Sequence, residues 1–441
     1  MFKFKPLAAA ILTLASVQVM AAGNTATQIQ LSGDGNDATV AQTGISNGNT
    51  ATQVQAGDNN EANVNQLDVS TGNVASQAQG GNHNTATIDQ KWGAYYNEAS
   101  QAQTGNDNIA TVDQHDEATS NHALQVQGGS ENNAFIENAY SAVGNYATQI
   151  QSGGSHDAEI WQQAGEGNQA LQTQDGYNNY AKAYQGAGGD LNYSVQTQTG
   201  DNNSSTTYQL INANGNFSTV TQNGTGAGND ALVDQGFGDG NWSVLDQDGD
   251  SNDATVTQKH GNGNASILSQ VGNGNGASVT QHDGDGNGST LTQTGNSNVA
   301  SVDQGNGSWN VSSLTQTGSN HNATVNQSGG NTNELYFEQD DDGNTLLVDQ
   351  VGNSNLITGY SEGYGNTADI DQTGDDNTVR VEQYAYSSGN LADISQNGSN
   401  HTATVLQGGA GNDAFITQTN THNTAWVFQT GTNGTATITQ N

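Results

Sequence analysis

The sequence predicts an all-β protein, a β-solenoid of about 18 two-strand rungs with a thin core and inward Asn and Gln ladders that stacks into cross-β fibres. Three observations lead to this expectation. A seven-residue unit of the form N-x-A/S-x-V/I/L-x-Q recurs along the chain, and each copy is followed by a Gly-rich turn. Hydrophobic residues make up only 31% of the chain and Gly contributes 58 residues, which leaves too few apolar side chains for several thick cores. The only proline is Pro6, so no proline interrupts strand pairing after the first residues.

Each unit predicts one strand. In the unit Asn287–Gln293, the Asn, Ser, Leu and Gln follow one another at two-residue steps, and alternate residues of a strand lie on the same face. These four positions of each unit therefore face inward, and the residues between them face outward. There are 36 such units, and the closing Gln is missing only from the units that end at Asn138 and Ser361.

Two successive units form one predicted rung. The spacing between units often alternates between about 13 and 11 residues, so the full period is 22 to 25 residues. In the first eight odd-numbered units the fifth residue is Gln, whereas from Asn216 onward it is mostly apolar. This change of core divides one continuous solenoid into residues 22–215, with Gln-rich odd strands, and residues 216–441, with more apolar odd strands.

The turns reverse the chain after each unit, so the two strands of a rung run antiparallel to one another. A third-position Ala then faces a fifth-position Val across the core, and the Asn at one strand start faces the Gln at the opposite strand end. Rungs stacked about 4.8 Å apart align Asn with Asn and Gln with Gln, and such amide ladders satisfy one another. The predicted assembly ladders include Asn24, Gln30, Asn36, Gln42, Asn108, Gln114, Asn252, Gln258, Asn423, Gln429 and Gln440.

Residues 1–21 predict a secretory signal peptide. Lys3 and Lys5 form a positive start, Leu7–Val19 is an apolar run, and Val19–Ala21 ends in a small residue suited to cleavage. A membrane anchor is the alternative, but the apolar run is too short to span a bilayer comfortably. We therefore expect a secreted, extracellular protein without membrane insertion.

The charge and composition of the chain limit its partners and its chemistry. The formal net charge is −37, which is the wrong sign for binding nucleic acid or anionic lipid. Without Cys there are no disulfides or thiolate metal sites. The turns Asp34–Asp37 and Asp340–Asn344 resemble calcium loops but lack a full ligand set with a distal Glu. No nucleophile–base arrangement or phosphate loop is present, so we predict no enzyme, no catalytic residue, no cofactor and no metal.

Two sets of outward-facing side chains leave alternatives open. Tyr146, Tyr193, Phe217 and Trp242 hold the second position of odd units and predict an exposed aromatic stripe. The stripe either stabilises the sheet by cross-strand stacking or makes lateral fibre or glycan contacts. The outward acidic residues of even strands either keep the chain soluble or slow its assembly until acid, salt or divalent cations weaken their repulsion.

The ends of the repeat array predict assembly. The first unit begins at Asn24 and the last closes at Gln440, which leaves no room for the polar caps of a soluble solenoid. Each terminal rung is expected to expose N–H and C=O groups that template another chain. The predicted product is a homopolymer, a fibre of cross-β type.

The repeat resembles the curlin repeat of curli, the extracellular amyloid fibres of Gram-negative bacteria. That repeat pairs S/N-x5-Q with a short Gly turn and N-x-A-x3-Q, which Asn97–Gln103, the turn Thr104–Asp107 and Asn108–Gln114 match closely. The resemblance implies a secreted structural subunit, a nucleator subunit, an outer-membrane secretion pore, and a role in biofilm matrix, adhesion and surface attachment, with matrix polysaccharide as a further partner. The chain differs from familiar curlins by its many more repeats and by the lack of a Gly-rich segment before the first one.

Two other functions compete with the fibre. A monomeric secreted β-solenoid that binds a surface, as an adhesin or an ice-binding protein, has support from outward Thr-x-Thr pairs such as Thr255 and Thr257. Asp residues interrupt these columns of Thr, however, whereas a flat ice-binding face needs regular columns of Thr. A polysaccharide-processing β-helix needs clustered acids with basic partners, and the chain has only six Lys and Arg residues.

Overall fold

The structure, a computed structural model, describes residues 23–441, which contain 36 strands and no helix. The predicted all-β solenoid fold is confirmed, and the strands correspond one to one with the sequence units. Since residues 23–441 form no helix, they contain none long and apolar enough to cross a membrane. The signal peptide predicted over residues 1–21 lies outside the described residues. The chain divides into two compact units, residues 1–164 and residues 165–441.

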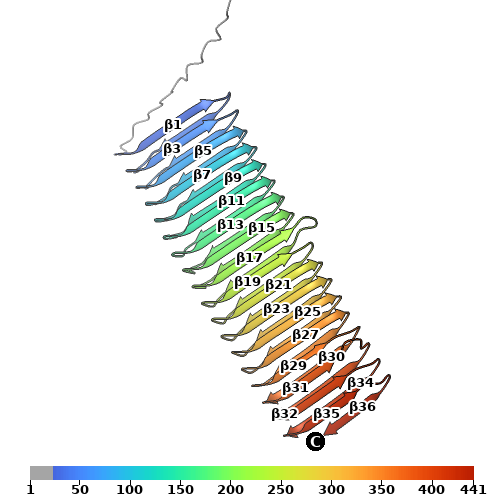
Figure 1. The fold of residues 1–441 in the computed structure, drawn as a ribbon. Coiled ribbons are helices and arrows are strands. Elements are labelled where there is room, and N and C mark those ends of the chain that lie inside the picture. The colour runs from blue at the N-terminus through green and yellow to red at the C-terminus, as the bar shows by residue number, and fades with distance from the viewer. Residues whose placement is uncertain (1–22) are drawn as a thin grey trace, which may run out of the picture. The chain divides into compact units, whose positions relative to one another are not determined.

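The described part of the first unit contains two parallel sheets, one of odd-numbered strands, which lie side by side in Figure 1, and one of even-numbered strands. The odd strands are β1 (Thr25–Ser32), β3 (Thr50–Ala56), β5 (Val74–Asn82), β7 (Glu98–Asn106), β9 (His122–Ser130) and β11 (Tyr146–Gly154). The even strands are β2 (Asp37–Gln42), β4 (Glu61–Gln66), β6 (Thr85–Gln90), β8 (Ile109–Gln114), β10 (Asn133–Ala139) and β12 (Asp157–Gln163). Each strand pairs with the strand two places further along the chain, so two consecutive strands make one rung.

The second unit repeats this arrangement with more rungs. Its odd strands are β13 (Gln169–Tyr177), β15 (Tyr193–Asp201), β17 (Phe217–Gly224), β19 (Trp242–Asp248), β21 (Ala265–Asn273), β23 (Gly288–Asn296), β25 (Val311–Ser319), β27 (Glu334–Asp342), β29 (Leu356–Ser361), β31 (Thr378–Gln383), β33 (Thr402–Gln407) and β35 (Thr424–Gln429). Its even strands are β14 (Tyr180–Gly186), β16 (Ser204–Leu210), β18 (Asp230–Gly236), β20 (Asp253–Lys259), β22 (Gly276–His282), β24 (Val299–Gly305), β26 (Asn322–Ser328), β28 (Thr345–Val351), β30 (Thr367–Asp375), β32 (Leu391–Ser399), β34 (Asp413–Thr421) and β36 (Thr435–Gln440). All pairings between these strands are parallel.

The register places each unit position on the same position of the next rung. In the pairing of β6 with β8, Ala86 lies beside Ala110 and Gln90 beside Gln114. A shift by one residue would move the Ala, Val and Gln of a strand to the outer face, so burial of one face determines the register.

The two sheets of a rung face one another across a thin core. Gln53 Nε2, from a fifth position of β3, donates to the carbonyl oxygen of Ala62 at a third position of β4, at 2.9 Å. Gln55 Nε2, from the seventh position, donates to the carbonyl oxygen of Asn60 at the first position, at 3.0 Å. These contacts confirm that third positions oppose fifth positions and that strand starts oppose strand ends.

The composition of this core changes along the chain. One apolar cluster in the second unit extends from Val220 to Val427 and includes Phe337, the largest of the fully buried side chains. In odd strands before Val220, such as β3 and β15, the facing fifth positions hold the buried amides of Gln53 and Gln196. Burying a Val or Leu side chain contributes about 1.5–3 kcal/mol, so hydrophobic stabilisation is concentrated after Val220.

A column of buried serines lies on the core-facing side of the second unit. Ser243, Ser266, Ser289 and Ser312 hold third positions of β19, β21, β23 and β25, and they stack in register. Their Oγ atoms are buried without a hydrogen-bond partner among the residues that the structure describes. Such a hydroxyl destabilises a protein by about 1–3 kcal/mol, because it has lost water and gained no replacement.

We therefore expect Ser266→Ala to stabilise the protein by about 1 kcal/mol, since Ala removes the hydroxyl and keeps the space filled. The midpoint of urea unfolding measures this change. Ser269→Ala is the matched control, because Ser269 lies on the outer face of the same strand. A stability for Ser266→Ala equal to or below that of the control would contradict the expectation.

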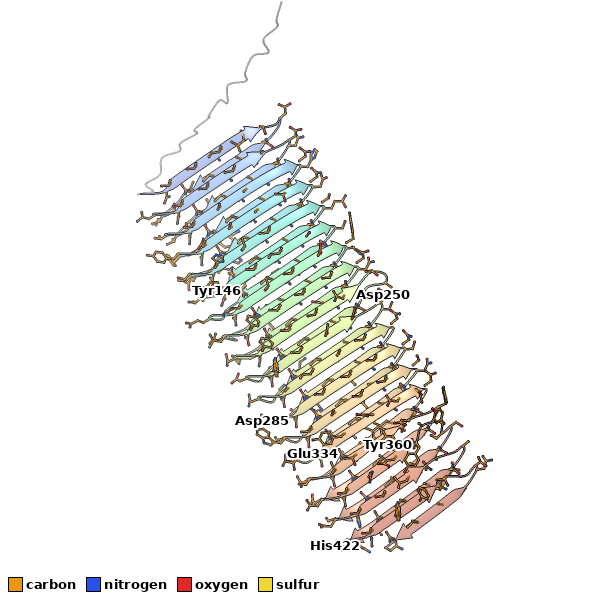
Figure 2. All side chains as sticks on the ribbon, in the orientation of Figure 1. Tyr146, Asp250, Asp285, Glu334, Tyr360 and His422 are labelled. Carbon is orange, nitrogen blue, oxygen red and sulfur yellow. The ribbon has the colours of Figure 1, made fainter. Side chains whose placement is uncertain are left out.

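Side chains at the turns accept backbone N–H groups of the neighbouring rung, and Figure 2 labels two of these side chains, Asp250 and Asp285. Asp250 Oδ1 accepts the backbone N–H of Gly226 at 2.9 Å, and Asp285 Oδ1 accepts that of Asn262 at 2.7 Å. In the calcium-like turns, Asp34 N–H donates to Asp58 Oδ1 at 2.8 Å and Gly363 N–H donates to Asp341 Oδ2 at 3.0 Å. Carboxylates at these turns therefore accept backbone N–H groups. Residues 23–441 contain no group of three or more His, Asp or Glu side chains placed to hold a metal ion.

Candidate functional site

The inward Gln side chains form a continuous hydrogen-bonded ladder in the even sheet of the second unit. Gln258 Nε2 donates to Gln281 Oε1 on the next rung at 2.8 Å. The same Nε2 donates across the rung to the carbonyl oxygens of Asn264 at 3.0 Å and Trp242 at 3.1 Å. Gln258 is fully buried, and its amide joins the two sheets of its rung and two successive rungs.

The inward Asn side chains connect each strand start to the rungs on both sides. The backbone N–H of Asn252 donates to Asn229 Oδ1 at 3.0 Å, and the N–H of Asn275 donates to Asn252 Oδ1 at 3.1 Å. Asn252 Nδ2 also donates to the carbonyl oxygen of Gly272 at 2.8 Å. Asn thereby satisfies backbone groups of the turn that neither sheet reaches.

The sequence-predicted ladder residues differ in burial according to their rung. Asn108, Gln114, Asn252 and Gln258 lie in inner rungs and are buried. The predicted residues of the first two and last two sequence units are partly or fully exposed, and these are Asn24, Gln30, Asn36, Gln42, Asn423, Gln429 and Gln440. Gln30 and Gln42 donate to Gln55 and Gln66, and Gln429 and Gln440 accept from Gln407 and Gln418.

The Gln ladders have a direction. In both units Nε2 donates to the Oε1 of the Gln on the following rung, as in Gln90 to Gln114 and Gln293 to Gln316, both at 2.8 Å. One side of such a rung therefore presents amide donors and the other presents amide acceptors.

Two ladder members were missed by the sequence pattern. Gln114 Nε2 donates to Asn138 Oδ1 at 3.3 Å, and Asn138 Nδ2 donates to Gln162 Oε1 at 2.8 Å. Ser361 Oγ donates to Gln383 Oε1 at 2.6 Å. Both residues stand at the seventh position of their units, where the other units have Gln. Their position in the repeat could therefore have identified them as ladder members, although their residue type does not match the pattern.

The family profile described as "Curlin associated repeat" matches residues 226–259, 306–329, 362–384 and 388–419, all in the second unit. The chain therefore contains multiple curlin repeats. No curated protein matches the sequence.

Histidine replaces ladder Asn at three positions of this curlin-repeat protein, His156, His321 and His401. His321 Nδ1 accepts the backbone N–H of Asn344 at 3.2 Å, and His401 Nδ1 accepts that of Asn423 at 3.3 Å. Both rings are buried. In these two places a ring nitrogen takes over the acceptor role of the Asn Oδ1.

The predicted aromatic stripe of the curlin-repeat protein is divided between its two units. In the second unit Tyr193 stacks on Phe217 at a centroid distance of 5.2 Å, and Phe217 meets Trp242 edge-on at 6.2 Å. In the first unit Tyr146 stacks at 5.8 Å on His122, a neighbour that the sequence analysis did not identify. Cross-strand stacking is therefore present, while Tyr146 and Trp242 also remain about half exposed.

Outward aspartates on β28, β30 and β32 lie beside one another in register. Asp349 pairs with Asp371, and Asp369 pairs with Asp393. Burial, and then repulsion from the carboxylate of Asp371, raises the pKa of Asp349, Asp369 and Asp393 above the usual 3.8. Between these raised pKa values and 3.8, the folded chain therefore binds more protons than the unfolded chain. The free energy of unfolding increases as the pH falls through this interval, and it decreases again as the pH rises.

We expect Asp371→Asn to stabilise the folded protein at pH 7 by about 0.5 kcal/mol and to weaken the stabilisation by acid, because the substitution removes the shared like charge. Urea midpoints measured at pH 7 and pH 4.5 test this. Asp413→Asn is the control, since the register neighbours of Asp413 are Leu391 and Thr435. An identical pH dependence of stability in both variants would show that the charge of Asp371 does not raise the pKa values of its neighbours.

Proposed function

We propose that the protein is the structural subunit of an extracellular, curli-like functional amyloid fibre, which grows by end-to-end β-strand stacking and serves biofilm matrix, adhesion and surface attachment. Curlin repeats and a β-solenoid fold fit a curli-like structural subunit. The observation that carries the proposal is the uniform register of the inward amides. Because nearly all rungs offer Asn at strand starts and Gln at strand ends, a rung of a second copy meets groups similar to those that an internal rung meets.

The direction of the Gln ladders supports head-to-tail growth. Gln258 donates toward the following rung and accepts from the preceding one. A face that presents amide donors therefore fits a face that presents acceptors, and two identical faces fit poorly. A head-to-tail contact of this kind does not close on itself, so it produces a filament rather than a dimer.

The partners proposed for this subunit follow from its family. They are further copies of the chain, a nucleator subunit, an outer-membrane secretion pore of a Gram-negative bacterium and a matrix polysaccharide. The net charge of −37 supports a role without nucleic acid or anionic membrane.

Assembly of the protein without residues 1–21, diluted from denaturant, tests the proposal. We expect thioflavin-positive fibres whose growth is accelerated by preformed seeds, with diffraction reflections near 4.7 and 10 Å. Single-filament imaging is expected to show that all chains of a filament point in the same direction, so that the two ends of the filament differ. A soluble monomer with strand-type circular dichroism that persists in the presence of seeds would instead support the monomeric surface binder, an adhesin or ice-binding protein.

A further inference from the structure

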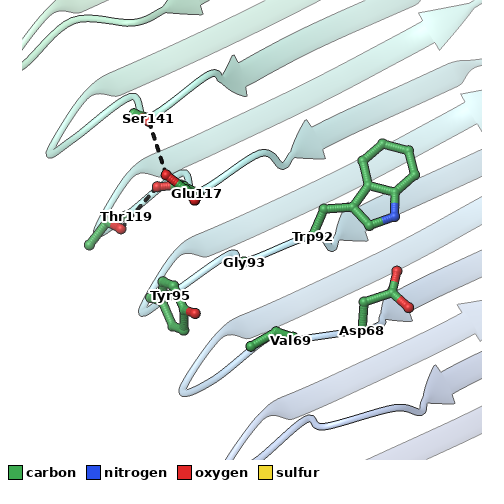
Figure 3. Close-up of a pocket in the computed structure, with 8 residues that line it drawn as sticks. All are labelled: Asp68, Val69, Trp92, Gly93, Tyr95, Glu117, Thr119 and Ser141. Carbon is green, nitrogen blue, oxygen red and sulfur yellow. Dashed lines mark hydrogen bonds between the residues drawn. The ribbon is translucent and has the colours of Figure 1, made fainter.

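A groove in the first unit runs across the turns that follow β4, β6, β8 and β10 (Figure 3). Its volume is about 640 Å³, and Trp92, Tyr95, Asp68 and Glu117 are among its lining residues. A second hollow of about 410 Å³ shares Trp92 and Glu117 with it and extends the groove to Tyr140. We call these two hollows together the turn groove.

Trp92 and Tyr140 are the exposed aromatic residues of the turn groove. Their φ values of 54° and 57° lie in the left-handed region, as do those of Asp68 (60°) and Asp116 (52°) at the same place in the neighbouring turns, so this conformation belongs to the stacked turns and not to the aromatic side chains. Trp92 and Tyr140 are 53% and 54% exposed, so both present ring surface to solvent.

The walls of the turn groove are held in place. Glu117 N–H donates to the carbonyl oxygen of Trp92 at 3.0 Å, and Ser141 N–H donates to that of Asp116 at 2.8 Å, so the turns stack as regularly as the strands. The ring of His115 lies between the two aromatic residues and meets Trp92 at 5.7 Å and Tyr140 at 5.8 Å, edge-on in both contacts. Both rings therefore have defined positions before a ligand arrives.

The side chains along the turn groove are spaced by the distance between successive rungs. Trp92 and Tyr140 belong to turns two rungs apart, a separation of roughly 9–10 Å at the usual strand spacing. The intervening turn contributes Asp116 and Glu117, and Ser141 Oγ lies 3.5 Å from Glu117 Oε2. Two aromatic platforms on either side of the His115 ring, with the carboxylate and hydroxyl groups of Asp116, Glu117 and Ser141 beside them, suit a chain of linked sugar rings. The C–H faces of the sugars contact the aromatic rings, and their hydroxyls donate to the carboxylates.

The charges of the turn groove narrow the class of ligand. Asp68, Asp116 and Glu117 repel an anionic polysaccharide. A cationic ligand would compete with Lys91, whose Nζ already lies 4.9 Å from the centre of the Trp92 ring. We propose that the turn groove of the first unit binds an extended, uncharged glycan through Trp92 and Tyr140. The groove is complete within one chain, so this binding does not depend on fibre assembly.

Calorimetric titration of the soluble protein with an uncharged β-1,4-linked glucose hexamer and with an N-acetylglucosamine hexamer tests the proposal. We expect at least one hexamer to bind, and Trp92→Ala and Tyr140→Ala each to weaken binding about tenfold, which corresponds to about 1.4 kcal/mol. Trp309→Ala is the matched control, because Trp309 is also exposed, at 65%, and also has a positive φ of 62°, but belongs to the second unit and does not line the turn groove. Its affinity is expected to be unchanged.

A second variant separates binding from folding. Glu117→Gln keeps the shape of the side chain, and we expect it to weaken binding of the uncharged hexamer and to reduce discrimination against an anionic uronate hexamer. Circular dichroism provides the check that each variant is folded. The proposal is overturned if the unsubstituted protein binds neither hexamer, if Trp309→Ala and Trp92→Ala have equal effects, or if only tetramethylammonium or spermidine binds at Trp92. Because the titration uses unassembled protein, its failure is distinguishable from a failure to form fibres.

Discussion

Gln281→Glu is expected to destabilise the folded protein by about 3–5 kcal/mol at pH 7 and to abolish seeded growth. Gln281 Nε2 donates to Gln304 Oε1 at 2.8 Å and to the carbonyl oxygens of Asn287 and Ala265 at 3.0 Å. A carboxylate at this fully buried position places an acceptor against three acceptors and buries a charge to which the neutral amide of Gln258 still donates. Urea unfolding and thioflavin-monitored growth measure the two effects.

The pH dependence of this variant identifies the cause. Burial raises the pKa of the new carboxyl group, so the folded state binds a proton more readily than the unfolded state, and part of the lost stability returns as the pH falls. Gln169→Glu makes the same chemical change at an exposed position of β13 and is expected to have little effect. Equal destabilisation by both substitutions, or no recovery in acid, would contradict the role given to the buried ladder.

Gly295→Ala is expected to cost about 3 kcal/mol or more, because it strains the backbone and collides with the next rung. Gly295 has a φ of 120°, and a Cβ there would lie 1.8 Å from the carbonyl oxygen of Gly318. The colliding atom belongs to the backbone of the next strand, β25, so it moves only if the rung spacing changes. Urea unfolding measures the loss, and hydrogen exchange of the amides in β23 and β25 shows whether it is local.

Two other glycines separate strain from collision. Gly263 has a φ of 64° with open space around its missing Cβ, so Gly263→Ala tests strain alone, at about 1–2 kcal/mol. Gly288 lies in β23 with open space and no positive φ, so Gly288→Ala is expected to be neutral or slightly stabilising. Any other order of stability among the three variants would refute the steric account of the stacked turns.

The strands and their inward faces were predictable because the information is local. Alternation within a unit such as Asn252–Gln258 places Ala254, Val256 and Gln258 on one face, and the structure buries those three residues. The facing of third and fifth positions followed from the turns in the same way. Asn138 and Ser361 were not predicted to join the ladder, since a pattern based on residue type does not show which short polar side chain still reaches its neighbour.

The sequence by itself determined the all-β solenoid, the number of strands and the inward set of Asn, Ala, Val and Gln, because a two-residue period and a turn signal are properties of neighbouring residues. Only the tertiary structure decided the direction of the Gln ladders, the unpartnered hydroxyls of Ser243 and Ser266, and the turn groove at Trp92 and Tyr140. Each of these depends on atoms more than 20 residues apart. Their contact is set by the register of stacked rungs and by the path of turns of unequal length, which local alternation does not specify.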